Sequence, residues 1–175
     1  MSYFAELFPL LRKLGATGLL IEYEDMFPYT GILADVPAFN CYSQADIREI
    51  NKLAEKSRLE VIPLIQTFGH LEFLLKLKPH SKLRYGAIAL NILREIITFI
   101  YREVFRYPQA ICPSHNKTFP LLTAMVDQVL QLHPHSKKLH IGCDEVFKDS
   151  NRRKISPKFV LRNLQQCLFP GVPAG

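Results

Sequence analysis

Three apolar runs that turn polar at their carboxyl ends constrain the fold of this sequence more than any other feature. The runs are TGLLIEYEDMF, LEVIPLIQTFGH and KKLHIGCDEV, and their polar ends hold Glu22, Glu24 and Asp25, then Gln66, Thr67 and His70, then Asp144 and Glu145. Nearly continuous apolar runs of this length are typical of buried parallel strands. Functional groups of parallel α/β proteins gather where the strands end. The pattern predicts a parallel α/β sheet or barrel with a site at that edge.

Helical patterns precede or separate the three runs. SYFAELFPLLRKLG ends at Gly15 and places four apolar residues on one face, namely Phe4, Leu7, Leu11 and Leu14. Pro9 lies inside this pattern and predicts a kink or a split helix, because proline removes a backbone hydrogen bond.

Two further helices are predicted. YSQADIREINKLAEKSRL opens with Ser43 and Asp46 at capping-box spacing and presents Ile47, Ile50 and Leu53 on one face. TFPLLTAMVDQVLQLHP is expected to begin near Pro120, since proline is favoured in the first turn, and to face inward through Leu122, Met125, Val126 and Val129.

Charge and composition favour a folded globular chain. The 175 residues are 48% hydrophobic and have a net charge of +6, which differs from the composition of disordered proteins. The basic excess is scattered apart from the short cluster Arg152 to Lys154. Because no basic stripe is interleaved with aromatic residues, solvated surface charge is the preferred interpretation and no nucleic-acid partner is expected.

Cysteine spacing and hydropathy indicate in which cellular compartment the chain is expected. The four cysteines form no CxxC pair, so we expect free thiols in a reducing compartment. The apolar segment GAIALNILREIITFIY contains Arg94 and Glu95 and is too short for a spanning helix, and the N-terminus lacks a signal pattern. The sequence predicts no membrane association.

The adjacent acids Asp144 and Glu145 are the strongest chemical candidates. Neighbouring side chains on a regular strand point to opposite faces, so the two share a pocket only if the strand has ended or twisted there. An ionised Asp144 would then raise the pKa of Glu145 and allow it to act as a general acid. The alternative is a turn at Asp144 with a solvated Glu145.

The other candidates also have structural alternatives. His70 would hydrogen-bond a carboxylate or substrate, or would be a capping or core residue. His140 is interpreted as a core histidine, and Glu22, Glu24 and Asp25 as either site residues or solvated acids. His70, His140 and the acid pair could together be imagined as metal ligands, but they are not arranged in an HxH or HExxH motif. A metal-dependent hydrolase is therefore the weakest interpretation.

LHIGCDEV resembles the catalytic strand of glycoside hydrolase family 20, the β-N-acetylhexosaminidases, whose signature is a His, a Gly and an Asp-Glu pair. GLLIEYEDMFPY and EVIPLIQTFGHLEF narrow the resemblance to the hexosaminidase D branch, which implies a cytoplasmic and nuclear location. The resemblance covers about residues 4–82 and 105–147. It implies hydrolysis of glycans or glycoconjugates that carry terminal N-acetylhexosamine, with no cofactor and no metal.

The resemblance implies substrate-assisted catalysis, in which the 2-acetamido oxygen of the substrate replaces a protein nucleophile. Asp144 would orient the acetamido group and stabilise its positive charge. Glu145 would protonate the leaving oxygen and later deprotonate water. His70 would support the pair, and Glu24 and Asp25 would line the same rim as substrate-binding residues.

The expected architecture is α/β, a partial TIM (β/α)₈ barrel with roughly strands 2 to 4, their helices and a helical insertion. Residues 1–147 form this partial barrel domain with an insertion at about 86–104, and residues 148–175 form a divergent polar and basic tail. A complete barrel needs about 250 residues, and the tryptophans that the family places around the sugar are absent. Weak or no turnover is therefore expected. The alternative is a non-catalytic product that self-associates through exposed sheet edges.

Overall fold

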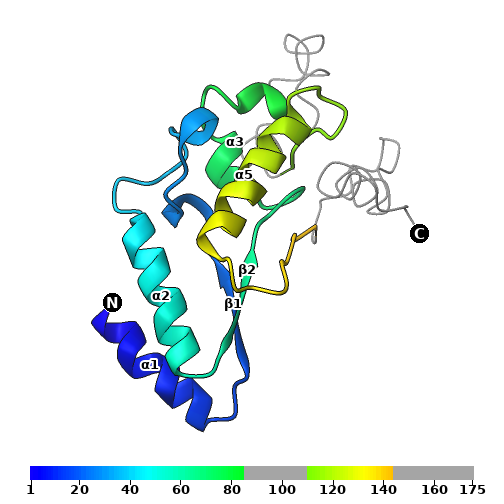
Figure 1. The fold of residues 1–175 in the computed structure, drawn as a ribbon. Coiled ribbons are helices and arrows are strands. Elements are labelled where there is room, and N and C mark those ends of the chain that lie inside the picture. Colours follow the sequence, from blue (N-terminus) through cyan, green and yellow to red (C-terminus); the bar gives the residue numbers. More distant parts are fainter. Residues whose placement is uncertain (85–109, 144–175) are drawn as a thin grey trace, which may run out of the picture. The chain divides into compact units, whose positions relative to one another are not determined.

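A computed structural model describes residues 1–84 and 110–143, which belong to two compact units. The first unit comprises Met1–Ile65 and Ala124–Ile141, and the second includes Gln66–Thr123 together with Gly142 and Cys143. The elements are α1 (Ser2–Lys13), β1 (Gly18–Glu22), the 3₁₀ helices η1 (Glu24–Met26) and η2 (Gly31–Leu33), α2 (Gln44–Lys56), β2 (Glu60–Leu64), α3 (Glu72–Leu75), η3 (Ser81–Leu83) and α5 (Thr118–Leu132) (Figure 1). Within these ranges the chain has a mixed α/β fold.

The small sheet is parallel, as the three apolar runs predict. β1 pairs with β2 in a register that runs from Gly18 opposite Glu60 to Glu22 opposite Leu64. The third run contributes a single parallel bridge, between His140 and Leu64. Glu22, Leu64 and His140 therefore occupy one row, and the three runs end at the same edge of the sheet.

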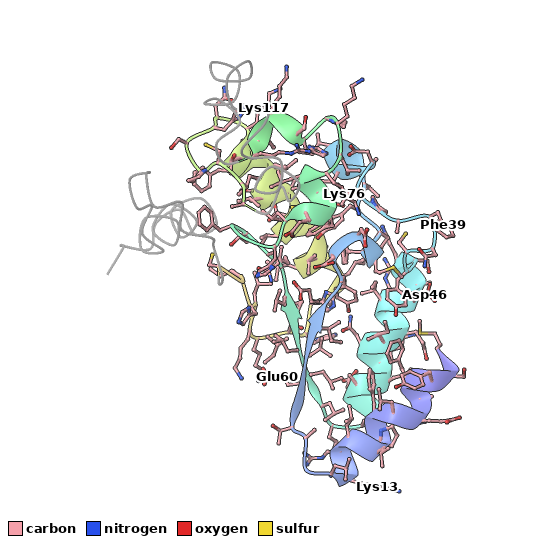
Figure 2. All side chains as sticks on the ribbon, turned by 180° about the vertical axis from the view of Figure 1, so that it is seen from behind. Lys13, Phe39, Asp46, Glu60, Lys76 and Lys117 are labelled. Atoms are coloured by element: carbon pink, nitrogen blue, oxygen red, sulfur yellow. The ribbon has the colours of Figure 1, made fainter. Side chains whose placement is uncertain are left out.

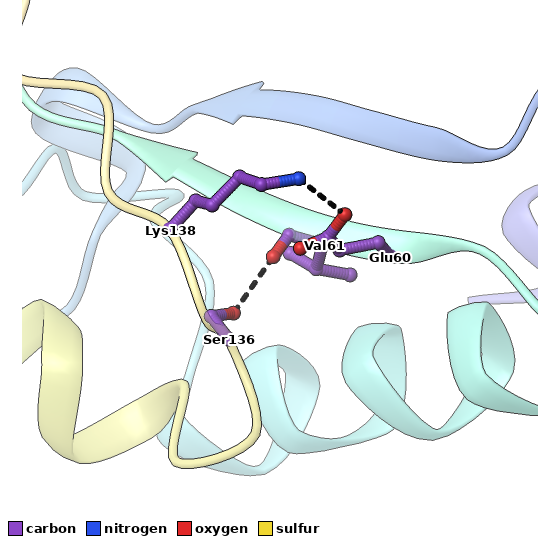
Figure 3. A network of polar contacts seen from close by, with 4 residues as sticks. All are labelled: Glu60, Val61, Ser136 and Lys138. Carbon is purple, nitrogen blue, oxygen red and sulfur yellow. Dashed lines mark hydrogen bonds and ion pairs between the residues drawn. The ribbon is translucent and has the colours of Figure 1, made fainter.

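Residues 136–140 follow β2 along its length in the first unit. The Ser136 hydroxyl donates to the Val61 carbonyl oxygen at 2.8 Å, and the Lys138 ammonium lies 2.9 Å from a Glu60 carboxylate oxygen (Figure 3). The His140 amide then donates to the Pro63 carbonyl oxygen at 2.9 Å. An exposed ion pair of this kind contributes about 0.5 kcal/mol, so backbone bonds and the Ser136 contact hold this segment in register.

The core of the first unit lies between the sheet and two helices. Figure 1 shows α1 and α2 side by side next to the β1–β2 pair, and Phe8, Ile50 and Val61 are buried between these elements. Leu19 and Ile21 pack against this cluster. Because side chains alternate along a strand, Leu20 faces the opposite way and is 57% exposed.

Helix α1 tests two features of its sequence prediction. Of the two alternatives at Pro9, a kink or a split, the split is excluded because the helix continues through Pro9 as one element. Leu14 is not on the buried face: it lies just beyond the last helical residue, Lys13, and is 75% exposed. The helical period that placed Leu14 inward ends before it, and Phe8 is the buried residue of the helix.

The capping box of α2 is confirmed. The Ser43 hydroxyl accepts a hydrogen bond from the Asp46 amide at 3.1 Å, and the Asp46 carboxylate accepts from the Ser43 amide at 2.9 Å and its hydroxyl at 2.7 Å. These bonds hold the pKa of Asp46 below its usual value. Figure 2 labels Asp46 at the amino end of α2. Ile47 and Ile50 are buried as predicted, and Leu53 is half-buried.

Helix α5 begins two residues before the expected Pro120, and its predicted inward face is confirmed. The buried members of that face are Leu122, Met125, Val126 and Val129. No helix of the described residues is long and apolar enough to span a membrane. The predicted insertion at about 86–104 and the predicted tail at 148–175 lie outside the described residues.

A buried polar pair joins the carboxyl end of α5 to the segment after β1 in the first unit. The Tyr23 hydroxyl lies 3.0 Å from Nε2 of His133, and Nδ1 of His133 lies 2.7 Å from the Val129 carbonyl oxygen. The consistent assignment is a neutral imidazole that donates from Nδ1 and accepts the tyrosine proton at Nε2. Burial lowers the pKa of His133 and raises that of Tyr23.

Acidification should therefore weaken the first unit through His133. Because its pKa is lower in the folded chain than its unfolded value of about 6.5, the stabilisation is complete above that pH and is lost as the pH falls below it. We expect His133→Gln to reduce the difference between the free energies of unfolding measured in denaturant at about pH 7.5 and pH 5.5. His135→Gln, which changes an exposed histidine two residues away, should retain the full difference. Equal pH dependence in the two variants would refute this assignment.

Candidate functional site

Unusual backbone conformations mark the three polar segments that follow the sheet. Among the described residues, Glu24, Arg58, His70 and Cys143 are the non-glycine residues with positive φ. Arg58 follows helix α2, whereas the other three follow β1, β2 and the His140 bridge. A non-glycine residue in this region costs about 1–2 kcal/mol. Strained residues of this kind concentrate at functional sites, so each of the three segments is by itself a candidate for a functional role.

The first segment carries Glu24 and Asp25. Glu24 has φ 48° and is exposed, and Asp25 is half-buried. The loop folds back on this segment, because the Ala38 amide donates to the Asp25 carbonyl oxygen at 2.7 Å and the Tyr42 amide donates to the Met26 carbonyl oxygen at 2.9 Å. The structure thus places the two predicted rim acids together on a backbone that is anchored within the first unit.

The second segment, QTFGH, is buried although it contains several polar residues. Gln66 is 7% exposed and Thr67 is fully buried, while His70 is half-buried with φ 52°. The Phe68 carbonyl oxygen accepts from the Ile111 amide at 2.9 Å. Connecting segments usually lie at the surface, so a buried polar turn after a strand indicates that it has a specific structural or functional task.

The second unit also anchors the residues that follow this turn. The Arg84 guanidinium donates twice to the Leu75 carbonyl oxygen, at 3.0 and 2.8 Å, at the end of helix α3. The Cys112 amide donates to the Leu83 carbonyl oxygen at 2.7 Å, and the Thr118 hydroxyl donates to the Cys112 carbonyl oxygen at 2.6 Å. His70 therefore precedes a short helix whose carboxyl end is hydrogen-bonded to a later part of the same unit.

The third segment turns immediately before the predicted acid pair. Gly142 and Cys143 have φ values of 66° and 73°, so strand geometry does not continue past Ile141. This is the condition under which neighbouring residues stop alternating between the two faces of a sheet. Asp144 and Glu145 themselves lie outside the described residues.

The turn of the third segment contacts the buried turn of the second within the second unit. Thr67 Oγ1 lies 3.1 Å from Cys143 Sγ. A Cβ atom on Gly142 would overlap the Gln66 side-chain amide and lie 3.2 Å from Gln66 Cα. The structure thus brings the backbone that leads into Asp144 against the segment that leads into His70.

Two features of these segments differ from the sequence predictions or extend them. His140 is exposed, so its interpretation as a core histidine is wrong. Its backbone pairs with β2, while the residue as a whole is exposed. The sequence placed Gln66 and Thr67 at a strand end but assigned them no task. The only sequence signal of such a task was a polar pair directly after an apolar run.

Among the described residues, no group of three or more His, Cys, Asp or Glu side chains is arranged to hold a metal ion.

Comparison with known proteins identifies the class. Residues 5–165 match Glycosyl hydrolase family 20, catalytic domain. The chain belongs to this family of glycoside hydrolases, whose catalytic domain implies a TIM barrel.

Two similar proteins give a more specific comparison than the family model does. Hexosaminidase D of Bos taurus is 48% identical over 147 residues, which make up 84% of this chain and 37% of the bovine protein. Hexosaminidase D of Homo sapiens is also 48% identical over 147 residues, which make up 26% of the human protein. The chain therefore spans little more than a third of one relative and about a quarter of the other.

Gly142→Ala should destabilise the chain by more than an ordinary left-handed glycine does. Gly31 has a similar φ, 63°, but no heavy atom lies within 4 Å of the point that a Cβ atom would occupy, so Gly31→Ala incurs only the backbone strain of about 1 kcal/mol. Gly142→Ala adds the overlap with Gln66, and we expect a total of about 2–4 kcal/mol. Urea denaturation of both variants measures the difference. Equal losses would show that Gly142 and Gln66 are not in close contact.

Proposed function

We propose that this chain carries the acid/base strand of a β-N-acetylhexosaminidase that removes terminal non-reducing N-acetylhexosamine residues with retention of configuration. The main support is the family match over residues 5–165, which includes the HIGCDEV run. The left-handed turn at Gly142 and Cys143 adds support, because it ends the strand before Asp144 and Glu145.

In the proposed mechanism the 2-acetamido oxygen of the substrate attacks the anomeric carbon while the glycosidic bond breaks. Glu145 donates its proton to the leaving oxygen, and Asp144 orients the acetamido group and stabilises the charge of the bicyclic oxazolinium intermediate. Glu145, now a carboxylate, removes a proton from water as the water attacks the same carbon. Two inversions at this carbon give overall retention.

The remaining assignments belong to the same proposal. β1, β2 and residues 136–141 correspond to strands 2 to 4 of a TIM barrel, so their carboxyl ends face the substrate side. His70 supports the acid pair, and Glu24 and Asp25 line the rim. N-acetylhexosamine-containing glycans or glycoconjugates are the proposed substrates, and the cytoplasm and nucleus the proposed location. The names of the two hexosaminidase D relatives support the substrate class.

The role of Glu145 can be tested through the leaving group. Glu145→Gln should lower kcat/KM for an alkyl β-N-acetylhexosaminide by about 10²–10⁴-fold, because an alkoxide needs protonation as it departs. A nitrophenyl glycoside, whose leaving group is stable without a proton, should lose much less in the first step. Asp127→Asn, an exposed acid on α5, is the control and should retain the wild-type rates.

Attack by the acetamido oxygen is tested separately. Replacing the N-acetyl group of the substrate by N-trifluoroacetyl should slow wild-type hydrolysis, because fluorine withdraws electron density from the attacking oxygen. Equal rates for the two substrates would indicate a protein nucleophile instead. We expect wild-type turnover by this chain to be weak, and complete absence of turnover with every substrate would reject hydrolysis by it and favour the second candidate.

The second candidate is a non-catalytic chain that associates with itself through the sheet. Within residues 1–84 and 110–143, β1 pairs with β2 alone and Leu20 is 57% exposed on the face away from the helices. An apolar strand with an open edge is a template for pairing with another copy. This observation favours self-association at β1.

Leu20→Lys should reduce any such association, because a charged side chain on the strand opposes pairing with a second copy. Light scattering behind size-exclusion chromatography measures the mass of each variant. Leu14→Lys, which changes an exposed leucine outside the sheet, should leave the mass unchanged. A wild-type monomer across the concentration range would contradict the second candidate.

A further inference from the structure

We propose that Tyr23 is a positioning residue for the rim acids Glu24 and Asp25, because the bond between its hydroxyl and His133 holds the turn that carries them. This inference rests on the proposed function, since it assigns Tyr23 a task in substrate binding by these two acids. Tyr23 itself is not assigned any contact with the substrate. All four residues belong to the first unit.

The Tyr23 side chain is held in the interior of the first unit. It is 5% exposed, and its hydroxyl lies 3.0 Å from Nε2 of His133, the residue that follows helix α5. Nδ1 of His133 lies 2.7 Å from the Val129 carbonyl oxygen, so the imidazole is itself attached to that helix. The Tyr23 ring contacts the rings of Phe27 and Tyr42, with centroid distances of 5.7 and 6.4 Å. The side chain is therefore fixed at both its ring and its hydroxyl.

The backbone of Tyr23 begins the turn that carries the two acids. Tyr23 directly precedes η1, and its carbonyl oxygen accepts a hydrogen bond from the Met26 amide at 2.8 Å. The helix η1 has only three residues, and a helical turn of this length is not stable by itself. Its conformation therefore depends on contacts with the rest of the first unit.

Glu24 holds a strained backbone between two anchors. Its φ of 48° is left-handed although it is not a glycine, and such a conformation persists only where the surroundings impose it. After the turn, the Ala38 amide donates to the Asp25 carbonyl oxygen at 2.7 Å. Before it, the anchor is the Tyr23 side chain with its bond to His133. A buried hydrogen bond and the strain of one left-handed residue are similar in size, so loss of this bond would let Glu24 relax.

Relaxation at Glu24 would redirect both acids. Glu24 is exposed and Asp25 is half-buried, so complete burial fixes neither side chain. The backbone of the turn therefore sets the direction in which each carboxylate leaves it. Binding groups must stay within about 0.5 Å of their productive positions, and a change from left-handed to ordinary φ would exceed this tolerance.

The experiment removes one hydroxyl and keeps the ring. Tyr23→Phe deletes the bond to His133, and His133→Phe deletes its acceptor. Tyr29→Phe is the matched control, because Tyr29 is 6% exposed in the same unit and its ring contacts Phe27 at 4.7 Å. This control loses the hydroxyl of a buried tyrosine without touching the bond to His133. Circular dichroism establishes that each variant is folded before its other properties are compared.

The first readout reports the backbone of Glu24 and needs no substrate. A residue with positive φ brings its amide proton close to its own α-proton and gives a strong intraresidue nuclear Overhauser effect. We expect this signal for Glu24 in the wild type and in Tyr29→Phe. Tyr23→Phe and His133→Phe should each weaken it, because Glu24 then spends time at ordinary φ values.

The second readout is sugar binding. Separate NMR titrations with N-acetylglucosamine and N-acetylgalactosamine give the Kd of each. Tyr23→Phe should raise the Kd of the sugar that binds by about 5-fold or more, whereas Tyr29→Phe should leave it unchanged. Introducing Tyr23→Phe into a variant that already carries Glu24→Gln and Asp25→Asn should add little, because its effect passes through these acids.

Turnover gives a third comparison. With a nitrophenyl β-N-acetylhexosaminide, Tyr23→Phe should raise KM with a smaller change in kcat, because the rim acids bind the ground state and the transition state alike. A purely structural role of Tyr23 would lower stability without changing KM.

The outcomes separate this inference from the proposed function. If neither sugar binds the wild type and no glycoside is hydrolysed, the proposed function fails, and the Glu24 signal still decides whether Tyr23 positions the turn. If Tyr23→Phe resembles Tyr29→Phe in the Glu24 signal or in sugar affinity, the inference is overturned. The same holds if Tyr23→Phe weakens binding equally when both carboxylates are already removed. If Tyr23→Phe fails to fold, His133→Phe provides the comparison from the other side of the bond.

Discussion

The parallel pairing that aligns Glu22, Leu64 and His140 is the constraint on which the rest of the candidate site depends. Backbone hydrogen bonds set this row, and parallel pairing makes every strand end at the same edge. A one-residue slip would turn all side chains of a strand to the opposite face. The register therefore determines where each strand ends at the edge of the sheet.

Each polar segment then leaves the sheet through a strained residue, and the three segments are supported in different ways. Loop amides anchor the backbone around Asp25 in the first unit, whereas burial and the Ile111 contact hold the turn before His70 in the second. The Gly142–Cys143 turn contacts Gln66 and Thr67. Contacts of this kind offset strain of about 1–2 kcal/mol per residue.

Much of the fold could be predicted from local patterns. The capping residues Ser43 and Asp46 identified α2, and the apolar period of α5 identified its buried face, because both depend on residues within one helix. Predictions failed where the surroundings of a residue, not its local pattern, decide the outcome. Leu14 satisfied the helical period but lies past the end of the helix, and His140 matched a core strand but faces solvent. No local sequence pattern predicts the pairing of Tyr23 with His133, because the two residues are 110 positions apart in the chain.

The sequence by itself determined in what order the strands and helices follow one another, and it predicts which residues bear the chemistry. Periodicity, capping residues and the Asp-Glu pair are local properties that need no partner. The tertiary structure alone decided that Thr67 meets Cys143, that Gly142 approaches Gln66, and that three strand ends share one row. These are relations between segments far apart in the chain. Their geometry follows from hydrogen bonding and packing in three dimensions, because only the folded chain brings such residues within contact distance.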